Sequence, residues 1–177
     1  MLPEELLKRM TEAESLENTL LLFSLPRQAV AKQIVERAPT SCEYVELTRS
    51  PLLGCTSARS SISDMESLQL EDFWLYPFVA FSGDIKLLSN AMDGGGEREL
   101  KILLKSSDLS LCRAVLAENK DVLGITTRLD EKYMKSSGLV SIPIEPEIPI
   151  VYSYVTAKQN KNPALREFIE ILEMEFC

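Results

Sequence analysis

The sequence predicts an α/β fold, because short apolar segments alternate with amphipathic segments along most of the chain. Residues 20–24 and 78–81 are apolar runs of the kind that suits a strand covered on both faces, as in a parallel sheet. With 177 residues, the chain is long enough for one domain or two small lobes. We therefore predict α/β layers around a largely parallel sheet.

The first half of the chain predicts helices and strands in turn. Pro3 suits an early helical position, and the apolar residues after it share one helical face. The strand at residues 20–24 leads into a helix that starts at Pro26 and stops before Pro39. We predict helices at residues 3–13 and 26–37, strands at 20–24, 44–47 and 52–56 with a turn at 49–51, a polar loop at 58–64 and a helical turn at 67–72.

The second half continues the alternation and carries two helix caps. Ser106, Ser107 or Asp108 can cap a helix whose apolar face includes Cys112 and Leu116. Asn162 caps the last helix, which begins at Pro163. We predict strands at residues 78–81, 100–104, 122–125, 139–144 and 150–155, a helix at 85–92 that stops at the glycines 94–96, and a short helix or loop at 128–138.

Composition excludes several classes of function. A net charge of −8 and a pI near 4.7 argue against a nucleic-acid surface. The absence of histidine removes the commonest general base and metal ligand, and the four cysteines are not spaced as a zinc site. No apolar run approaches the ~20 residues of a membrane span, and the acidic start is not a secretory signal. We expect a cytoplasmic, non-enzymatic protein with reduced cysteines, no metal and no cofactor.

Four segments of the chain carry a resemblance to a known family. They are EYVELTRSPLLGCTS (43–57), LQLEDFWLYPFVAFSGD (68–84), SSDLSLCRAVLAENKDVLGITT (106–127) and GLVSIPIEPEIPIVYSYVTAKQNKNPALREFIEIL (138–172). Together, and in this order, they resemble the effector-binding domain of LysR-type transcriptional regulators.

The resemblance implies a two-lobed fold of the type 2 periplasmic-binding-protein kind. It implies a first lobe from residues 1–75 and 146–177, and a second lobe from residues 76–145. The family's helix-turn-helix, linker helix and first β-α unit have no counterpart in this sequence. We therefore expect a fragment or a shortened gene with an incomplete first lobe, and no direct nucleic-acid contact from this chain.

Candidate ligand-binding residues follow predicted strands, where the family's ligands lie between the lobes. Ser82 and Gly83 precede a predicted helix, whose start favours anions, although Ser82 or Asp84 could equally be a plain helix cap. Thr126 and Thr127 follow another strand, and the alternative there is the ordinary β-propensity of threonine.

A fifth candidate, Ser24, follows the strand at residues 20–24 and would face the same cleft from the first lobe, unless it only caps the next helix. Glycines 94–96 lack the frame of a phosphate loop. Cys112 has no basic partner in the sequence that would activate it, so a buried core thiol is favoured.

The leading hypothesis is a ligand-sensing, dimerising regulatory domain that binds a small anionic metabolite. The resemblance implies a homodimer in which a helix of one lobe packs antiparallel to a strand of the other, with helices at 26–37 and 108–118 as candidates. The alternative is a degenerate or trimmed domain that only dimerises. An enzyme on the same fold is disfavoured, because histidine and a carboxylate pair for acid–base chemistry are lacking.

Overall fold

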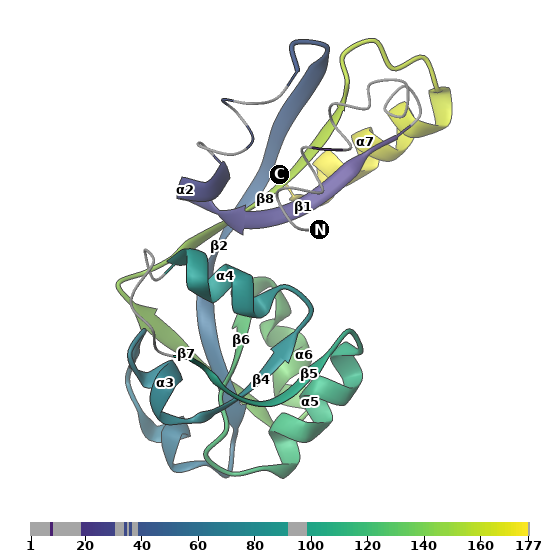
Figure 1. Cartoon of the computed structure of the whole chain (residues 1–177). Coiled ribbons are helices and arrows are strands. Elements are labelled where there is room, and N and C mark those ends of the chain that lie inside the picture. Colours follow the sequence, from purple (N-terminus) through teal and green to yellow (C-terminus); the bar gives the residue numbers. More distant parts are fainter. Residues whose placement is uncertain are drawn as a thin grey trace. The chain divides into compact units, whose positions relative to one another are not determined.

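A computed structural model describes residues 8, 19–30, 34, 36, 39–91 and 99–176. The chain divides into two compact units, which we call unit 1 (Met1–Arg49 and Ile150–Cys177) and unit 2 (Ser50–Pro149). Both contain helices and strands, so the predicted α/β class is confirmed (Figure 1). The predicted helix at residues 3–13 apart from residue 8, the glycines 94–96 and most of residues 31–38 lie outside the described residues.

Unit 1 is built on an antiparallel strand pair. Strand β1 (Leu21–Pro26) pairs with β8 (Pro149–Ala157) in a register that runs from Leu21 opposite Val155 to Pro26 opposite Ile150. The first part of β2 (Cys42–Ser57) lies on the other side of β8. Alternate residues of β1 are buried, so one face of the strand enters a core. The buried members of this core are Leu21, Phe23, Leu25, Val30, Ile34, Cys42, Val151 and Val155.

Two helices of unit 1 flank this pair. Helix α2 (Arg27–Val30) follows β1 directly, so Pro26 is the last residue of the strand instead of the first of the helix. Helix α7 (Pro163–Phe176) begins after Asn162, whose Oδ1 accepts hydrogen bonds from the Ala164 and Leu165 amides at 3.1 and 3.4 Å. The predicted cap is thereby confirmed. Tyr154 of β8 donates a 2.7 Å hydrogen bond to Glu173 and so ties the helix to the sheet.

Unit 2 combines an antiparallel group of strands with a parallel pair. The second part of β2 pairs antiparallel with β6 (Gly124–Thr127) and β7 (Leu139–Glu145), and β7 pairs parallel with β3 (Leu68–Gln69). Strand β4 (Pro77–Phe81) pairs parallel with β5 (Lys101–Ser106). The helical elements are η3 (Ser61–Asp64), α3 (Asp72–Leu75), α4 (Asp84–Ala91), α5 (Leu109–Glu118), η4 (Arg128–Asp130) and α6 (Glu131–Ser136).

The largely parallel sheet predicted from the sequence is wrong, because β1–β8, β2–β6 and β2–β7 are all antiparallel. Apolar runs indicate that both faces of a strand are covered, but they do not encode strand direction. The long strand β2 runs through both units and has partners in each, β8 in unit 1 and the antiparallel strands β6 and β7 in unit 2.

The turn predicted at residues 49–51 is also wrong. Figure 1 shows one long strand, β2, which continues through Pro51. Proline has no amide hydrogen, and a strand tolerates it where no ladder bond needs one. The registers with β6 and β7 begin at Leu52 and Leu53, so Pro51 precedes both of these ladders.

The helical turn predicted at residues 67–72 is displaced. Leu68 is fully buried and pairs with Ile144 in β3, and the turn begins only at Asp72. The Asp72 carboxylate accepts a 2.8 Å hydrogen bond from the Gln69 amide. Burial of one leucine in the sheet therefore decides the local conformation over helical propensity.

Candidate functional site

Three parallel strand segments of unit 2 end at one edge. Phe81, the last residue of β4, lies opposite Ser106, the last residue of β5. A parallel bridge between Phe78 and Leu123 aligns β6 with β4, so Thr126 and Phe81 each lie three residues beyond it. We call residues 82–84, 106–108 and 126–128, which lie at or just beyond the ends of these strands, the strand-end edge of unit 2. Helices α4 and α5 and the short helix η4 begin here.

Ser82 and Gly83 form an exposed turn between β4 and α4. Gly83 has φ +102°, which side chains other than glycine's rarely allow, and a Cβ there would meet no atom within 4 Å. The turn is held by Asp84, whose Oδ2 accepts a 2.7 Å hydrogen bond from the Phe81 amide. The backbone is thus open to a ligand at Ser82 and Gly83, but a carboxyl group lies directly beside them.

Asp84 is a carboxyl group whose ionisation is suppressed. Burial raises its pKa to about 7, and the hydrogen bond from the Phe81 amide offsets only part of that rise. The group is therefore about half protonated at neutral pH. A protonated carboxyl repels an anion less than an ionised one, so Asp84 makes the α4 start a pH-dependent environment.

Thr126 and Thr127 are buried at the end of β6, opposite Leu53 and Leu52 of β2. Side chains alternate along a strand, so Thr126 lies on the same face as Gly124. A Cβ at Gly124 would approach Leu116 of α5 to 2.9 Å, which shows that this face is covered by α5. Thr126 is therefore directed toward α5.

Asp108 occupies the start of α5. Its Oδ1 accepts hydrogen bonds from the Ser110 and Leu111 amides at 2.8 and 3.1 Å, and Ser106 Oγ accepts one from the Asp108 amide at 3.0 Å. The predicted cap is confirmed. These amides are the groups that an anion at the helix start would use, so the cap leaves that position less suited to an anion.

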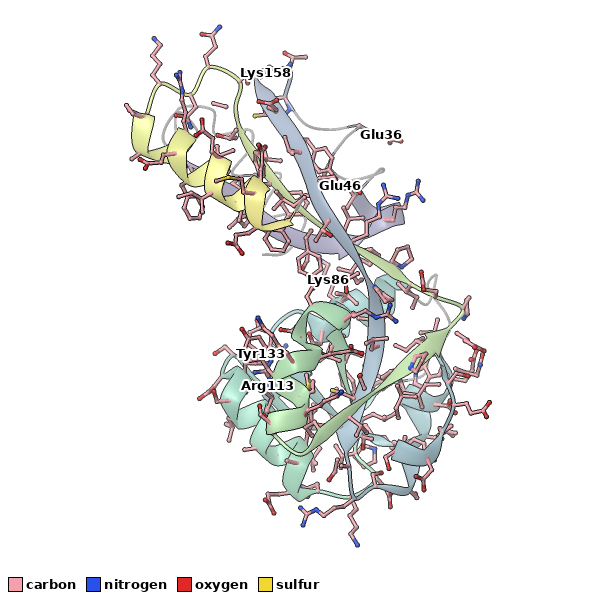
Figure 2. All side chains as sticks on the ribbon, turned by 180° about the vertical axis from the view of Figure 1, so that it is seen from behind. Glu36, Glu46, Lys86, Arg113, Tyr133 and Lys158 are labelled. Atoms are coloured by element: carbon pink, nitrogen blue, oxygen red, sulfur yellow. The ribbon has the colours of Figure 1, made fainter. Side chains whose placement is uncertain are left out.

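Arg113 and Tyr133 were not singled out in the sequence. Figure 2 shows the two side chains beside each other, Arg113 from α5 and Tyr133 from α6. The guanidinium carbon lies 5.7 Å from the ring centroid, and Nη2 lies 3.8 Å from Asp130 Oδ1. The available signal was position, because Arg113 directly follows Cys112 and precedes Leu116 by three residues, at the border of the apolar face.

The five predicted site residues do not all lie in one unit. Ser82, Gly83, Thr126 and Thr127 lie at the strand-end edge of unit 2. Ser24 lies in unit 1, exposed in the middle of β1 and opposite Tyr152 of β8. Their role in binding stays a prediction.

The described cysteines are unsuited to thiolate chemistry. Cys42, Cys55 and Cys112 are free and buried. Burial raises the pKa of Cys55 to about 12 and also raises that of Cys112. Among the described residues, no group of three or more acidic, cysteine or histidine side chains gathers as metal ligands would. Within the same part of the chain, no helix is both long and apolar enough to cross a membrane.

No family model and no curated protein matches the sequence. Solved structures do match the fold. One is the regulatory domain of MetR, a LysR family regulator from N. meningitidis, with a TM-score of 0.69 and 10% identity over 98% of this chain and 74% of that one. A second is HinK, a LysR family transcriptional regulator from Pseudomonas aeruginosa, with a TM-score of 0.65 and 11% identity over 98% of this chain.

A third match is full-length CbnR in complex with its target DNA, with a TM-score of 0.63 and 14% identity over the whole of this chain. The chain spans only 57% of HinK and 56% of CbnR. The resemblance seen in the sequence is thereby confirmed in the fold. This chain has the fold of the regulatory domain of LysR-family transcriptional regulators.

Proposed function

We propose that the chain is a ligand-sensing regulatory domain of a LysR-type transcriptional regulator. The observation that carries this proposal is the fold likeness to the MetR regulatory domain, which extends over 98% of the chain. Four sequence segments that resemble the family, in the family's order, support it independently. Its neighbours are regulators and not enzymes, in keeping with a non-enzymatic role.

The proposed ligand is a small anionic metabolite bound between two lobes, one of residues 76–145 and the other of residues 1–75 and 146–177. Ser82, Gly83, Thr126 and Thr127 would contact the ligand from the second lobe and Ser24 from the first. The strand-end edge supports this choice, because it gathers hydroxyl groups, a left-handed glycine and two helix starts.

We also propose that the chain forms a homodimer through its β5–α5 face. Four large apolar side chains are exposed there, between 40 and 51% of their surface: Ile102, Leu103, Leu109 and Leu111. The helix proposed as the antiparallel counterpart, at residues 26–37, is described only in part. We further propose a cytoplasmic location and no direct contact with DNA, and the net charge of −8 supports the second of these.

A thermal-shift screen against metabolite acids tests the ligand. At a concentration a hundred times its Kd, an effector stabilises a folded domain by about 2.7 kcal/mol. We expect at least one acid to raise the midpoint, and Thr126→Val to reduce that rise. Ser110→Ala, an exposed substitution on α5 outside the proposed contacts, is the control. A screen in which no acid raises the midpoint would contradict ligand sensing.

The second candidate is a domain that only dimerises. It is favoured by Asp84 and Asp108, which place the chain's own carboxyl groups at the two helix starts that an anion would use. Sedimentation showing a dimer, combined with a negative ligand screen, would support this candidate. The substitution Leu103→Glu on the exposed β5 face should then yield monomers, whereas Leu75→Glu, at a more exposed position on α3, should not.

A further inference from the structure

The guanidinium of Arg113 lacks the hydrogen bonds that such a group normally makes. Its side chain is only 20% exposed, and its Nε is buried without a hydrogen-bond partner among the described residues. A buried donor without an acceptor destabilises the folded state, so native structures rarely retain one without a purpose. The position of Arg113 therefore requires an explanation.

The neighbours of Arg113 hold its side chain in place but do not accept hydrogen bonds from its N–H groups. Asp130 Oδ1 lies 3.8 Å from Nη2, beyond hydrogen-bond distance. The Tyr133 ring supports the guanidinium carbon at 5.7 Å, an attractive contact that uses none of its N–H donors. The donor edge made by Nε and Nη2 is thus held in place and forms an ion pair with Asp130, but it makes no hydrogen bond with a described residue.

Arg113 also lies close to the strand-end edge of unit 2. It is on the first two turns of α5, which starts at that edge, and Asp130 is three residues beyond Thr127. Thr126 is directed toward α5 from β6. The N–H donors of Arg113 that lack a hydrogen bond therefore lie on a helix that begins at the candidate site. All the residues involved belong to unit 2.

We propose that Arg113 binds the carboxylate of an anionic ligand on its Nε–Nη2 edge, which the ligand reaches by displacing Asp130, because Nε is buried in the unliganded domain. This deepens the proposed function, on which it rests for the ligand's biological role. The planar edge of a guanidinium matches the two oxygens of a carboxylate with two parallel hydrogen bonds. Asp130 adds a negative charge nearby, so a singly charged carboxylate is favoured over the doubly charged sulfate or phosphate.

Asp130 becomes a competitor in this arrangement. In the unliganded domain it is the nearest described carboxylate to Nη2, and a bound ligand would take its place. Asp130 ends η4 and directly precedes α6, whose Tyr133 rests against Arg113. Ligand binding would thereby change the contact between α5 and α6, and so it would affect the packing of unit 2 beyond the site itself.

The side-chain Nε–Hε signal of Arg113 in the NMR spectrum of the whole chain tests this proposal. Sodium acetate is the probe, sodium chloride at equal ionic strength is the blank, and sodium sulfate tests the charge preference. We expect the signal to move saturably with acetate, and to move less with sulfate. The Arg113→Lys variant assigns the signal by its loss.

Asp130→Asn should tighten acetate binding roughly threefold, the size expected from removal of one nearby like charge at a partly exposed site. Arg59→Lys is the matched control, since the Arg59 Nη2 bonds to the Ala117 carbonyl at the other end of α5. A wild-type signal that moves no further in acetate than in chloride overturns the proposal, as does stronger binding of sulfate. A metabolite that stabilises wild type and Arg113→Lys equally would retain ligand sensing and reject only this role of Arg113.

Discussion

Two segments of similar sequence, Ser-Gly-Asp at 82–84 and Ser-Ser-Asp at 106–108, lie at the ends of two neighbouring parallel strands but differ in what their aspartates do. Asp108 is exposed and accepts hydrogen bonds from two amides of its own helix. Asp84 is partly buried and accepts its hydrogen bond from Phe81 of the preceding strand. The same residue thus stabilises a helix in one place and a strand-to-helix turn in the other.

A shift of one residue accounts for this difference. Phe81 lies opposite Ser106, so the first segment starts one position later relative to its strand than the second. Asp108 consequently has the extended backbone of an N-cap, whereas Asp84 is already the first helical residue. Register, and not residue type, decides which carboxyl group is buried and which is free to cap.

The substitution Asp84→Asn should have the largest effect. The pKa of Asp84 is raised from 3.8 to about 7 in the folded chain, so the folded state retains a proton that the unfolded state releases. Stability therefore falls as the pH rises from about 4 to about 7, by about 2–4 kcal/mol. The side-chain oxygen of the introduced asparagine still accepts the hydrogen bond from the Phe81 amide. Because asparagine does not titrate, the free energy of unfolding of the variant should no longer fall over this pH range.

Urea denaturation at pH 5 and pH 8 measures this effect. The Asp84→Asn variant should be more stable than wild type at pH 8, and the difference should shrink at pH 5. Asp108→Asn, at the corresponding place in the second segment, is the control. This variant should lose stability between pH 5 and pH 8 as wild type does. Equal stabilities of wild type and Asp84→Asn at pH 8 would contradict a suppressed ionisation.

Gly83→Ala comes next in size. With φ +102°, Gly83 adopts a backbone conformation that strains an L-residue, although a Cβ would find open space. We expect a loss of about 1–2 kcal/mol from backbone strain alone. The middle residue of the other segment provides the comparison, because Ser107→Ala should change the free energy of unfolding by less than about 0.5 kcal/mol. Similar losses in both variants would show that the two turns are equally strained.

Asp108→Ala removes a helix cap. The Ser110 and Leu111 amides would lose their acceptor, at a cost of about 1 kcal/mol. Asp108→Asn keeps an acceptor oxygen and should retain most of that stability. Thermal denaturation of the two variants separates the lost cap from the lost charge. A full loss in the asparagine variant would show that charge, and not the hydrogen bonds, stabilises α5.

Local sequence signals predicted the parts of the fold that depend on local physics. The caps at Asp108 and Asn162 were predictable, because a capping side chain acts on amides two or three residues away. The continuous strand through Pro51 was not, since its partners, β6 and β7, lie more than 70 residues further along the chain. Pairing over such distances is set by the tertiary structure.

The residues of the candidate site also differ in whether local sequence signals could predict them. The sequence predicts Ser82, Gly83, Thr126 and Thr127 as candidates because they follow apolar runs, and strand ends are visible in the sequence. The sequence does not predict Arg113, because its proposed role depends on contacts with Asp130 and Tyr133, which lie beyond strand β6 in the chain. The raised pKa of Asp84 was likewise invisible, because burial is a property of the folded chain.

Ser106→Ala should have the smallest effect, and it tests the origin of the one-residue shift. Ser106 Oγ accepts a 3.0 Å hydrogen bond from the exposed Asp108 amide, which holds Asp108 in the extended conformation of a cap. An exposed side-chain-to-backbone hydrogen bond contributes about 0.5 kcal/mol. Ser82→Ala, at the first position of the other segment, is exposed and should cost less. A double-mutant cycle between Ser106→Ala and Asp108→Ala should show coupling, because the serine acts through the cap; additive effects would mean that the cap forms without it.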